Sequence, residues 1–229
     1  MKTDIGDERV VYWWQDKPDN PHGRIVLLHG AGAPADSAWM NEVASCLCTQ
    51  GWWVLRAELA YMAQRREDGR KRPPPRADRL LEEVKSLVAE VPGPDELPRI
   101  LAGKSMGGRL MSMLATRTLW PQSMQKPAAV LALGYPFHPP GKPERLRTDH
   151  FADLAVPLRV VQGTRDPMGG AELVKGLTLP DTVSLDWVGQ GNHDLRPLGL
   201  RKQEVWSHLH HTLVQQQPWL QARAQAQSQ

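Results

Sequence analysis

The chain has 229 residues and a mass of 25.7 kDa, and 41% of its residues are hydrophobic, which excludes a disordered tail and predicts one domain over residues 1–229. The net charge of +3 and the pI near 9.0 are too mild to indicate nucleic-acid binding by themselves. The segment 1–9 is charged, and no apolar run approaches about 20 residues, so we expect a cytoplasmic protein. Cys46 and Cys48 match no zinc spacing, and we expect no metal or other cofactor.

Apolar runs and helix-like patterns alternate along the first half of the chain. A β-prone run at 10–14 predicts an outer strand, and the continuous apolar run at 25–28 predicts a parallel strand buried on both faces. The spacing then predicts a helix that begins after Asp36 or Ser37 and ends at Gly51, with a strand from Trp52. Further along we expect an irregular basic loop over 64–76 and a helix marked by Leu80, Leu81, Val84, Leu87 and Val88.

The segment 100–110 combines an apolar run, the motif Gly-x-Ser-x-Gly and a helix-like pattern, in that order. This context is typical of a nucleophile elbow, in which Ser105 stands on a sharp turn between Gly103 and Gly107. The overlapping Gly-Lys-Ser could also end a phosphate-binding loop, but that loop needs a glycine where this chain has Pro98. We therefore favour the elbow.

The second half continues the alternation. Apolar runs predict strands over 128–133, 158–162 and 184–188, and Val205, Leu209 and Leu213 mark a closing helix. The Gln- and Ala-rich tail over 215–229 is expected to be frayed. Strands alternating with helices predict an α/β fold with a mostly parallel sheet, helices on both faces, and a ligand site at the carboxyl ends of the strands.

A glycine cluster, Gly30-Ala31-Gly32, follows the strand at 25–28 and has two interpretations. It is a relaxed dinucleotide-binding fingerprint, with Glu58 as the ribose-binding acid, although Pro34 in the turn argues against this. Alternatively it is an oxyanion loop that aims a backbone N–H at a substrate carbonyl oxygen. In that case Ala31 and Met106 would supply the two N–H groups, and His29 would shape the loop.

Three residues follow successive strands in the order Ser105, Asp166, His193, which is the order of the catalytic triad in α/β-hydrolases. His193 would take the serine proton and deliver it to the leaving group, while Asp166 would hold the imidazole. Asp166 follows a strand directly, which favours it over its competitors. These competitors are Asp149, Asp153, Asp186 and Asp194.

The segments 103–109, 134–143 and 163–167 resemble those of bacterial members of a small α/β-hydrolase family. That family also contains a testis-expressed mammalian protein and a subunit of the NSL histone-acetyltransferase complex, and it is distantly similar to dienelactone hydrolases. The resemblance covers roughly 25–213. It implies the α/β-hydrolase fold and a serine-hydrolase triad at Ser105, Asp166 and His193, but no substrate. Relatives often carry an acid where this chain has Asn192.

About 24 residues separate Gly134 from Leu158, too few for a helical cap domain, so we expect an open, lidless site. Basic residues crowd the strand-to-helix loops, and Arg72, Arg76 and His138 are candidate substrate contacts at the rim. We predict a hydrolase of a small-molecule carboxylic ester or thioester, with no membrane or nucleic-acid partner, and the basic rim favours an anionic substrate. The alternative is a catalytically silent interaction module with the same fold.

Overall fold

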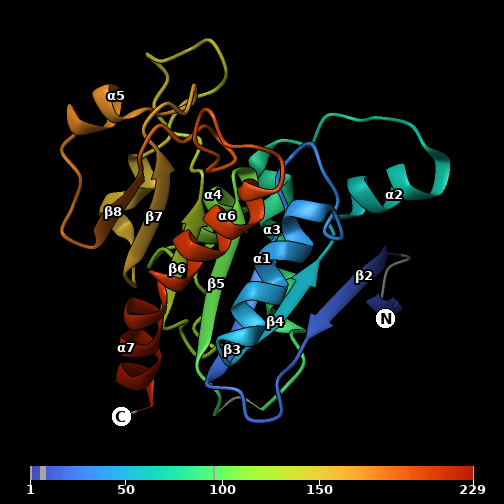
Figure 1. Cartoon of the computed structure of the whole chain (residues 1–229). Coiled ribbons are helices and arrows are strands. Elements are labelled where there is room, and N and C mark those ends of the chain that lie inside the picture. The colour runs from blue at the N-terminus through green and yellow to red at the C-terminus, as the bar shows by residue number, and fades with distance from the viewer. Residues whose placement is uncertain (1, 6–8, 95, 229) are drawn as a thin grey trace.

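A computed structural model describes residues 2–5, 9–94 and 96–228, so part of the charged segment 1–9 and the last residue of the expected tail lie outside the described residues. Within these ranges eight strands form one sheet in the order β1-β2-β4-β3-β5-β6-β7-β8 (Figure 1). The strands are β1 (Lys2–Ile5), β2 (Arg9–Asp16), β3 (Gly23–Leu28), β4 (Trp52–Ala57), β5 (Arg99–Lys104), β6 (Ala129–Leu133), β7 (Leu158–Gly163) and β8 (Val183–Val188). The helices are α1 (Ala38–Thr49), α2 (Ala60–Asp68), α3 (Ala77–Ala89), α4 (Met106–Leu114), α5 (Ala171–Lys175), α6 (Glu204–Val214) and α7 (Gln217–Gln227).

Strand direction follows the predicted pattern. β2 runs antiparallel to both β1 and β4, and from β4 to β8 every neighbouring pair is parallel. The central strands β3 and β5 pair with Leu27 opposite Ala102, so both end beside the elbow. The mostly parallel sheet that the sequence predicts is confirmed, and the carboxyl ends of its strands meet at one edge of the sheet (Figure 1).

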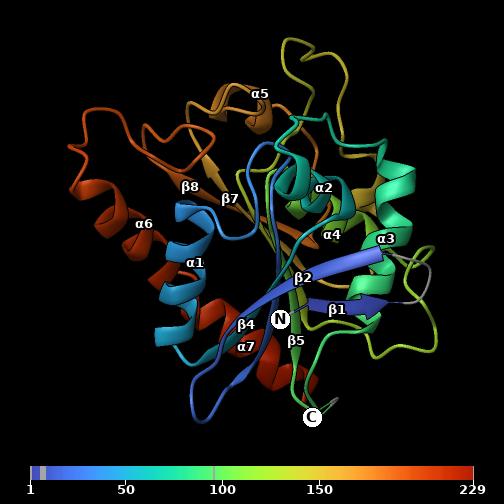
Figure 2. The ribbon, with the colours of Figure 1, turned by 90° about the vertical axis from the view of Figure 1, so that its right-hand side faces the viewer.

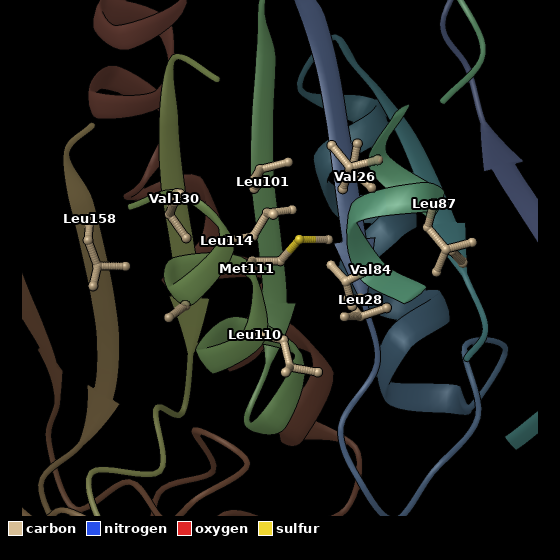
Figure 3. Packing of buried hydrophobic residues seen from close by; sticks show 14 of the residues in the cluster. Val26, Leu28, Val84, Leu87, Leu101, Leu110, Met111, Leu114, Val130 and Leu158 are labelled. Atoms are coloured by element: carbon tan, nitrogen blue, oxygen red, sulfur yellow. The ribbon is translucent and has the colours of Figure 1, made fainter. Parts of the chain in front are cut away.

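Two apolar clusters cover the two faces of the sheet. Alternate residues of a strand point to opposite faces, so Val26 and Leu28 join one cluster while Ile25 and Leu27 join the other. Helices α3 and α4 pack on the first face, and α1, α6 and α7 pack on the second (Figure 2). Figure 3 shows Met111 of α4 reaching between side chains of β5 and β3 in the first cluster.

Helix α2 replaces the first part of the irregular loop expected over 64–76, which was wrong for residues 64–68. Its apolar start, Tyr61-Met62-Ala63, is buried, and its charged end is held by ion pairs from Arg66 to Asp36 and Glu58. Gly69 ends the helix with φ of 70°, a left-handed conformation that glycine adopts without strain.

Helix α7 occupies most of the segment that was expected to be frayed. Alanine and glutamine are good helix formers, and the helix buries Leu220 and Ala224 against the sheet. Trp52 Nε1 donates a 2.7 Å hydrogen bond to Gln217 Oε1 at its first turn. Gln217 Nε2 also donates to Gln50 O at 2.9 Å, and Gln227 Oε1 accepts from Arg99 N at 3.0 Å, so polar contacts at both ends help to dock a segment that has no apolar stripe.

The segment 134–157, where a cap domain could enter, contains only the short 3₁₀ helix Asp149–Asp153. This agrees with the expected absence of a helical cap there. None of the helices in the described ranges is long and apolar enough to cross a membrane.

Candidate active site

Ser105 lies between β5 and α4 in a strained backbone conformation, with φ of 51° and ψ of −115°. The turn requires its two glycines. A Cβ on Gly103 would lie 2.2 Å from the Gly107 carbonyl carbon, and one on Gly107 would lie 2.3 Å from Leu28 O. Ser105 N donates to Leu133 O at 3.0 Å, which fixes the turn to β6. The local sequence therefore raises Ser105 above the carboxyl edge of the sheet.

The structure brings Ser105, His193 and Asp166 together in one chain of hydrogen bonds. Asp166 follows β7 and His193 follows β8. The Ser105 Oγ to His193 Nε2 distance is 2.7 Å, and the His193 Nδ1 to Asp166 Oδ2 distance is also 2.7 Å. When Nδ1–H donates to the carboxylate, Nε2 is free to accept the serine proton.

Asp166 is held by donors on both of its oxygens. Gln162 Nε2 donates to Oδ2 at 2.8 Å, and Met168 N donates to Oδ1 at 2.8 Å. Gln162 is fully buried and also bonds Gly169 O and both backbone groups of Tyr135. Sequence reasoning missed Gln162, although a polar residue at the end of an apolar strand was a usable signal. Its amide fixes the orientation of the carboxylate.

Lys104 connects the elbow to the histidine loop. Its Nζ donates to His193 O at 2.7 Å and lies 3.2 Å from Asp194 Oδ1 and 5.5 Å from the Trp39 ring centroid. Burial lowers the pKa of Lys104, and the charge of Asp194 opposes that shift. In the same loop Asn192 Oδ1 accepts hydrogen bonds from Asp194 N and Arg196 N. Asn192 thus shapes the loop that presents His193.

His29 holds the loop that follows β3. Leu59 N donates to His29 Nε2 at 3.1 Å, so the ring is neutral and its Nδ1–H donates to Gly30 O at 2.6 Å. Burial lowers the pKa of His29. A Cβ on Gly30 would lie 3.6 Å from Ser105 Cβ, so this loop runs directly beside the nucleophile.

A cavity of about 740 Å³ opens above Ser105. Ala31, Met106 and His193 line it around the serine, where the predicted oxyanion donors would be needed. Its walls combine apolar and basic side chains. The apolar ones include Trp39, Met40, Pro74, Pro75, Leu80, Leu110, Pro136, Pro140 and Met168, and the basic ones are Arg76, Lys104, Arg109 and Arg147.

The predicted rim residues have different positions. Arg76 lines the cavity mouth and is exposed. Arg72 is not among the lining residues and pairs with Asp68, with 2.8 Å between Nη1 and Oδ1. His138 is buried outside the lining, and its Nδ1 lies 2.7 Å from Pro139 O. Of two further lining arginines, Arg147 lies in a loop whose basic residues were expected at the rim, whereas Arg109 was not predicted as a site residue.

Glu58, the acid of the dinucleotide alternative, already has partners. It is fully buried, and its carboxylate accepts hydrogen bonds from Ala35 N and the Arg66 guanidinium. Of the acids that compete for the triad, Asp153 bonds Thr118 N and Asp186 bonds Gln216, whereas Asp194 lines the cavity but pairs with Lys104 Nζ at 3.2 Å. The geometry therefore favours the hydrolase interpretation over the dinucleotide-binding one.

Solved structures show the same fold over almost the whole chain. An alpha-beta serine hydrolase homologue from Coxiella burnetii matches with a TM-score of 0.65 and 16% identity, covering 94% of this chain and 96% of that one. Est1E from Butyrivibrio proteoclasticus with bound ferulic acid matches with a TM-score of 0.64 and 16% identity, covering 94% of this chain and 98% of that one. Dienelactone hydrolase from Anabaena variabilis matches with a TM-score of 0.65 and 19% identity, covering 96% of this chain and 94% of that one. The fold is therefore the α/β-hydrolase fold that the sequence predicted.

The family is defined by sequence as well. Residues 21–221 match the model of an alpha/beta hydrolase domain family, and the chain belongs to that family. None of the curated proteins compared with it matches. The similarity to dienelactone hydrolase agrees with the distant resemblance noted in the sequence.

Proposed function

We propose that this protein is a serine hydrolase that cleaves a carboxylic ester or thioester through an acyl-enzyme intermediate. The observation that carries the proposal is the continuous hydrogen-bonded chain Gln162–Asp166–His193–Ser105 at the base of the cavity. A serine hydroxyl is a weak nucleophile, and an imidazole 2.7 Å away can remove its proton during attack. The reaction needs no cofactor.

In the proposed first half-reaction, Ser105 Oγ attacks the carbonyl carbon while its proton moves to His193 Nε2. The carbonyl oxygen gains negative charge and accepts hydrogen bonds from the N–H groups of Met106 and Ala31. The C–O or C–S bond to the leaving group then breaks, and the leaving group takes the proton from His193. Asp166 stabilises the transient imidazolium.

In the second half-reaction, His193 takes a proton from water, and the resulting hydroxide attacks the acyl carbon. Collapse of this intermediate releases the acid and returns the proton to Ser105 Oγ. Because no helical cap enters between Gly134 and Leu158, short or soluble acyl groups suit the open site better than long lipids. The two cysteines, Cys46 and Cys48, are unpaired, which supports our placing the reaction in the cytoplasm.

Labelling by a fluorophosphonate probe tests the proposal. We expect the parent to be labelled and the variants Ser105→Ala and His193→Ala to remain unlabelled. Ser112→Ala is a matched control, because Ser112 Oγ also lies 2.8 Å from a histidine, His150 Nε2, but Ser112 is fully buried outside the cavity lining. This control should label like the parent.

Turnover of an activated ester such as 4-nitrophenyl acetate completes the test. Asp166→Asn should lower kcat by roughly 1,000- to 10,000-fold, because the amide no longer favours the required imidazole tautomer. A folded parent that neither labels nor turns over activated esters would overturn the proposal. The alternative, an interaction module that keeps the triad without using it, would then be favoured.

A further inference from the structure

The two groups of arginines near the cavity differ in their partners. On α2 and the segment after it, the guanidinium groups are matched within the protein. Arg66 binds Asp36 and Glu58, Arg72 binds Asp68, and Arg65 donates to Gly32 O at 3.0 Å. The charges of Arg66 and Arg72 are therefore already used to hold the fold.

Arg109 and Arg147 lie on another part of the cavity wall and have no such matching. Both line the cavity, and among the described residues neither forms an ion pair with a carboxylate. Arg109 Nε is buried without a hydrogen-bond partner in the described part of the chain. A buried donor left without an acceptor costs free energy, so the protein itself does not fully satisfy the Arg109 guanidinium.

The backbone holds both arginines in place. Arg109 lies one helical turn after the nucleophile, and its N donates to Ser105 O at 3.0 Å. Arg147 N donates to Phe137 O at 2.8 Å, and Arg147 O accepts from Tyr135 Oη at 2.7 Å. These contacts belong to the main chain, and the Arg109 side chain also contacts the Tyr135 hydroxyl, so neither guanidinium is paired with a carboxylate in the described part of the chain.

The two cations also destabilise each other. Burial is the larger cause that lowers the pKa of Arg147, and the positive charge of Arg109 lowers it further. Arg109 lies on the first turn of α4, where the helix dipole favours negative rather than positive charge. A negative group between them would reduce both the repulsion between the two cations and the unfavourable effect of the helix dipole on Arg109.

We propose that Arg109 and Arg147 form a subsite for a carboxylate carried by the substrate, so that the protein acts on anionic esters or thioesters. This inference rests on the proposed function and names its substrate class. Guanidinium groups bind carboxylates through paired, charge-assisted hydrogen bonds. One helical turn rises about 5.4 Å, so a short spacer of a few bonds separates this carboxylate from the carbonyl that Ser105 attacks. Exposed Arg76 at the mouth adds attraction for anions.

Matched pairs of esters test the subsite. In each pair a carboxylate is replaced by a primary amide of almost the same shape. 4-Acetoxybenzoate and 4-acetoxybenzamide place the group on the leaving side, while monomethyl glutarate and methyl glutaramate place it on the acyl side. We expect the parent to prefer the carboxylate in at least one pair by roughly 10- to 100-fold in kcat/KM, the range of a charged hydrogen bond.

Arg109→Gln and Arg147→Gln should each remove most of that preference, which is read within each variant as the ratio of kcat/KM for the carboxylate ester to kcat/KM for its amide. Arg79→Gln makes the same change at an exposed arginine of α3 outside the cavity lining and should keep the preference. Arg147→Gln changes a residue outside the helices and strands, so it tests the proposal even if Arg109→Gln fails to fold. No preference in either pair, or a preference that survives in Arg147→Gln, would overturn the subsite.

A binding measurement separates this proposal from the proposed function. Ligand-observed NMR titrations of Ser105→Ala with the same four esters need no turnover. Tighter binding of a carboxylate member, lost in the double variant Ser105→Ala/Arg147→Gln, would support the subsite even if the parent were catalytically silent. Equal binding of carboxylate and amide members would reject it even if the parent hydrolysed neutral esters.

Discussion

The arginines of α2 and the pair Arg109 and Arg147 carry the same charge but meet different surroundings. Arg66 contacts two carboxylates, one of them fully buried, whereas Arg109 and Arg147 line the cavity and pair with no carboxylate in the described part of the chain. A high density of basic residues in the sequence therefore does not mean that their charge is available to a ligand. The matched arginines hold the fold, and the unmatched pair creates a positive site that a bound anion would neutralise.

We expect the largest effect when an arginine that is paired with acids is removed. Arg66→Gln removes the ion-pair partner of Glu58, whose side chain is fully buried, and leaves its carboxylate with the Ala35 N–H. We expect the free energy of unfolding to fall by about 2–3 kcal/mol, because a buried charge is left uncompensated. Urea unfolding measures this loss. Arg70→Gln, at an exposed arginine of the same segment, is the control and should change stability by less than about 0.5 kcal/mol.

The next effect depends on pH and reports the burial of His150 near Arg109. Burial, helped by the charge of Arg109, lowers the pKa of His150 to about 4. The unfolded chain therefore binds the extra proton between about pH 6.5 and 4, and stability falls as the pH drops through that window. Replacing His150 with Gln should remove on the order of 1–3 kcal/mol of this acid sensitivity, as followed by thermal unfolding at pH 7 and 4.5.

The exposed His211 of α6 provides the matched control for this experiment. His211→Gln should keep the pH dependence of the parent. Equal acid sensitivity of His150→Gln and the parent would contradict the prediction.

Lys104 is intermediate between the two groups, since it is a buried cation matched by Asp194. Lys104→Met removes its hydrogen bond to His193 O and loosens the loop that presents the imidazole. If the proposed function holds, we expect kcat for a neutral ester to fall about tenfold, with KM changed less than about twofold, because Lys104 acts as a positioning residue. A rise in KM with unchanged kcat would show that Lys104 contacts the substrate instead.

The smallest effect concerns the unmatched pair itself. Arg147→Gln relieves repulsion from Arg109 without leaving a carboxylate unpaired, so the free energy of unfolding should rise by less than about 1 kcal/mol. Calorimetry should show an increase in Tm of roughly 1–3 °C. A lower Tm would mean that Arg147 stabilises the fold, and the contrast with Arg66 would disappear.

Much of the fold followed from the sequence because buried parallel strands leave an unmistakable pattern of short apolar runs. Strands β3 to β8 and the elbow were predicted in this way, and the structure brings Ser105, Asp166 and His193 together as their order suggested. Helix α2 was missed in part because its stabilising contacts are non-local. Arg66 reaches Asp36, which is 30 residues away in the sequence.

The cavity wall could not be predicted for a related reason. Arg109 and Arg147 come from an elbow helix and a distant loop, and nothing in either segment shows that both line one space. Arg72 belonged to the most basic run of the chain, yet its neighbour Asp68 neutralises it one helical turn away. Whether an arginine is available to a ligand depends on which acids the tertiary structure places beside it.

The buried imidazole of His29 makes the loop beside the nucleophile insensitive to mild acid. It acts as a fixed bridge, with one nitrogen accepting from Leu59 N and the other donating to Gly30 O, and this pattern exists only for the neutral ring. Because burial lowers its pKa, the bridge survives where an exposed imidazole would already be charged. The proposed site thus holds two histidines with opposite requirements. In the proposed mechanism His193 gains and loses a proton in every cycle, whereas His29 keeps the loop in place only while it never gains one.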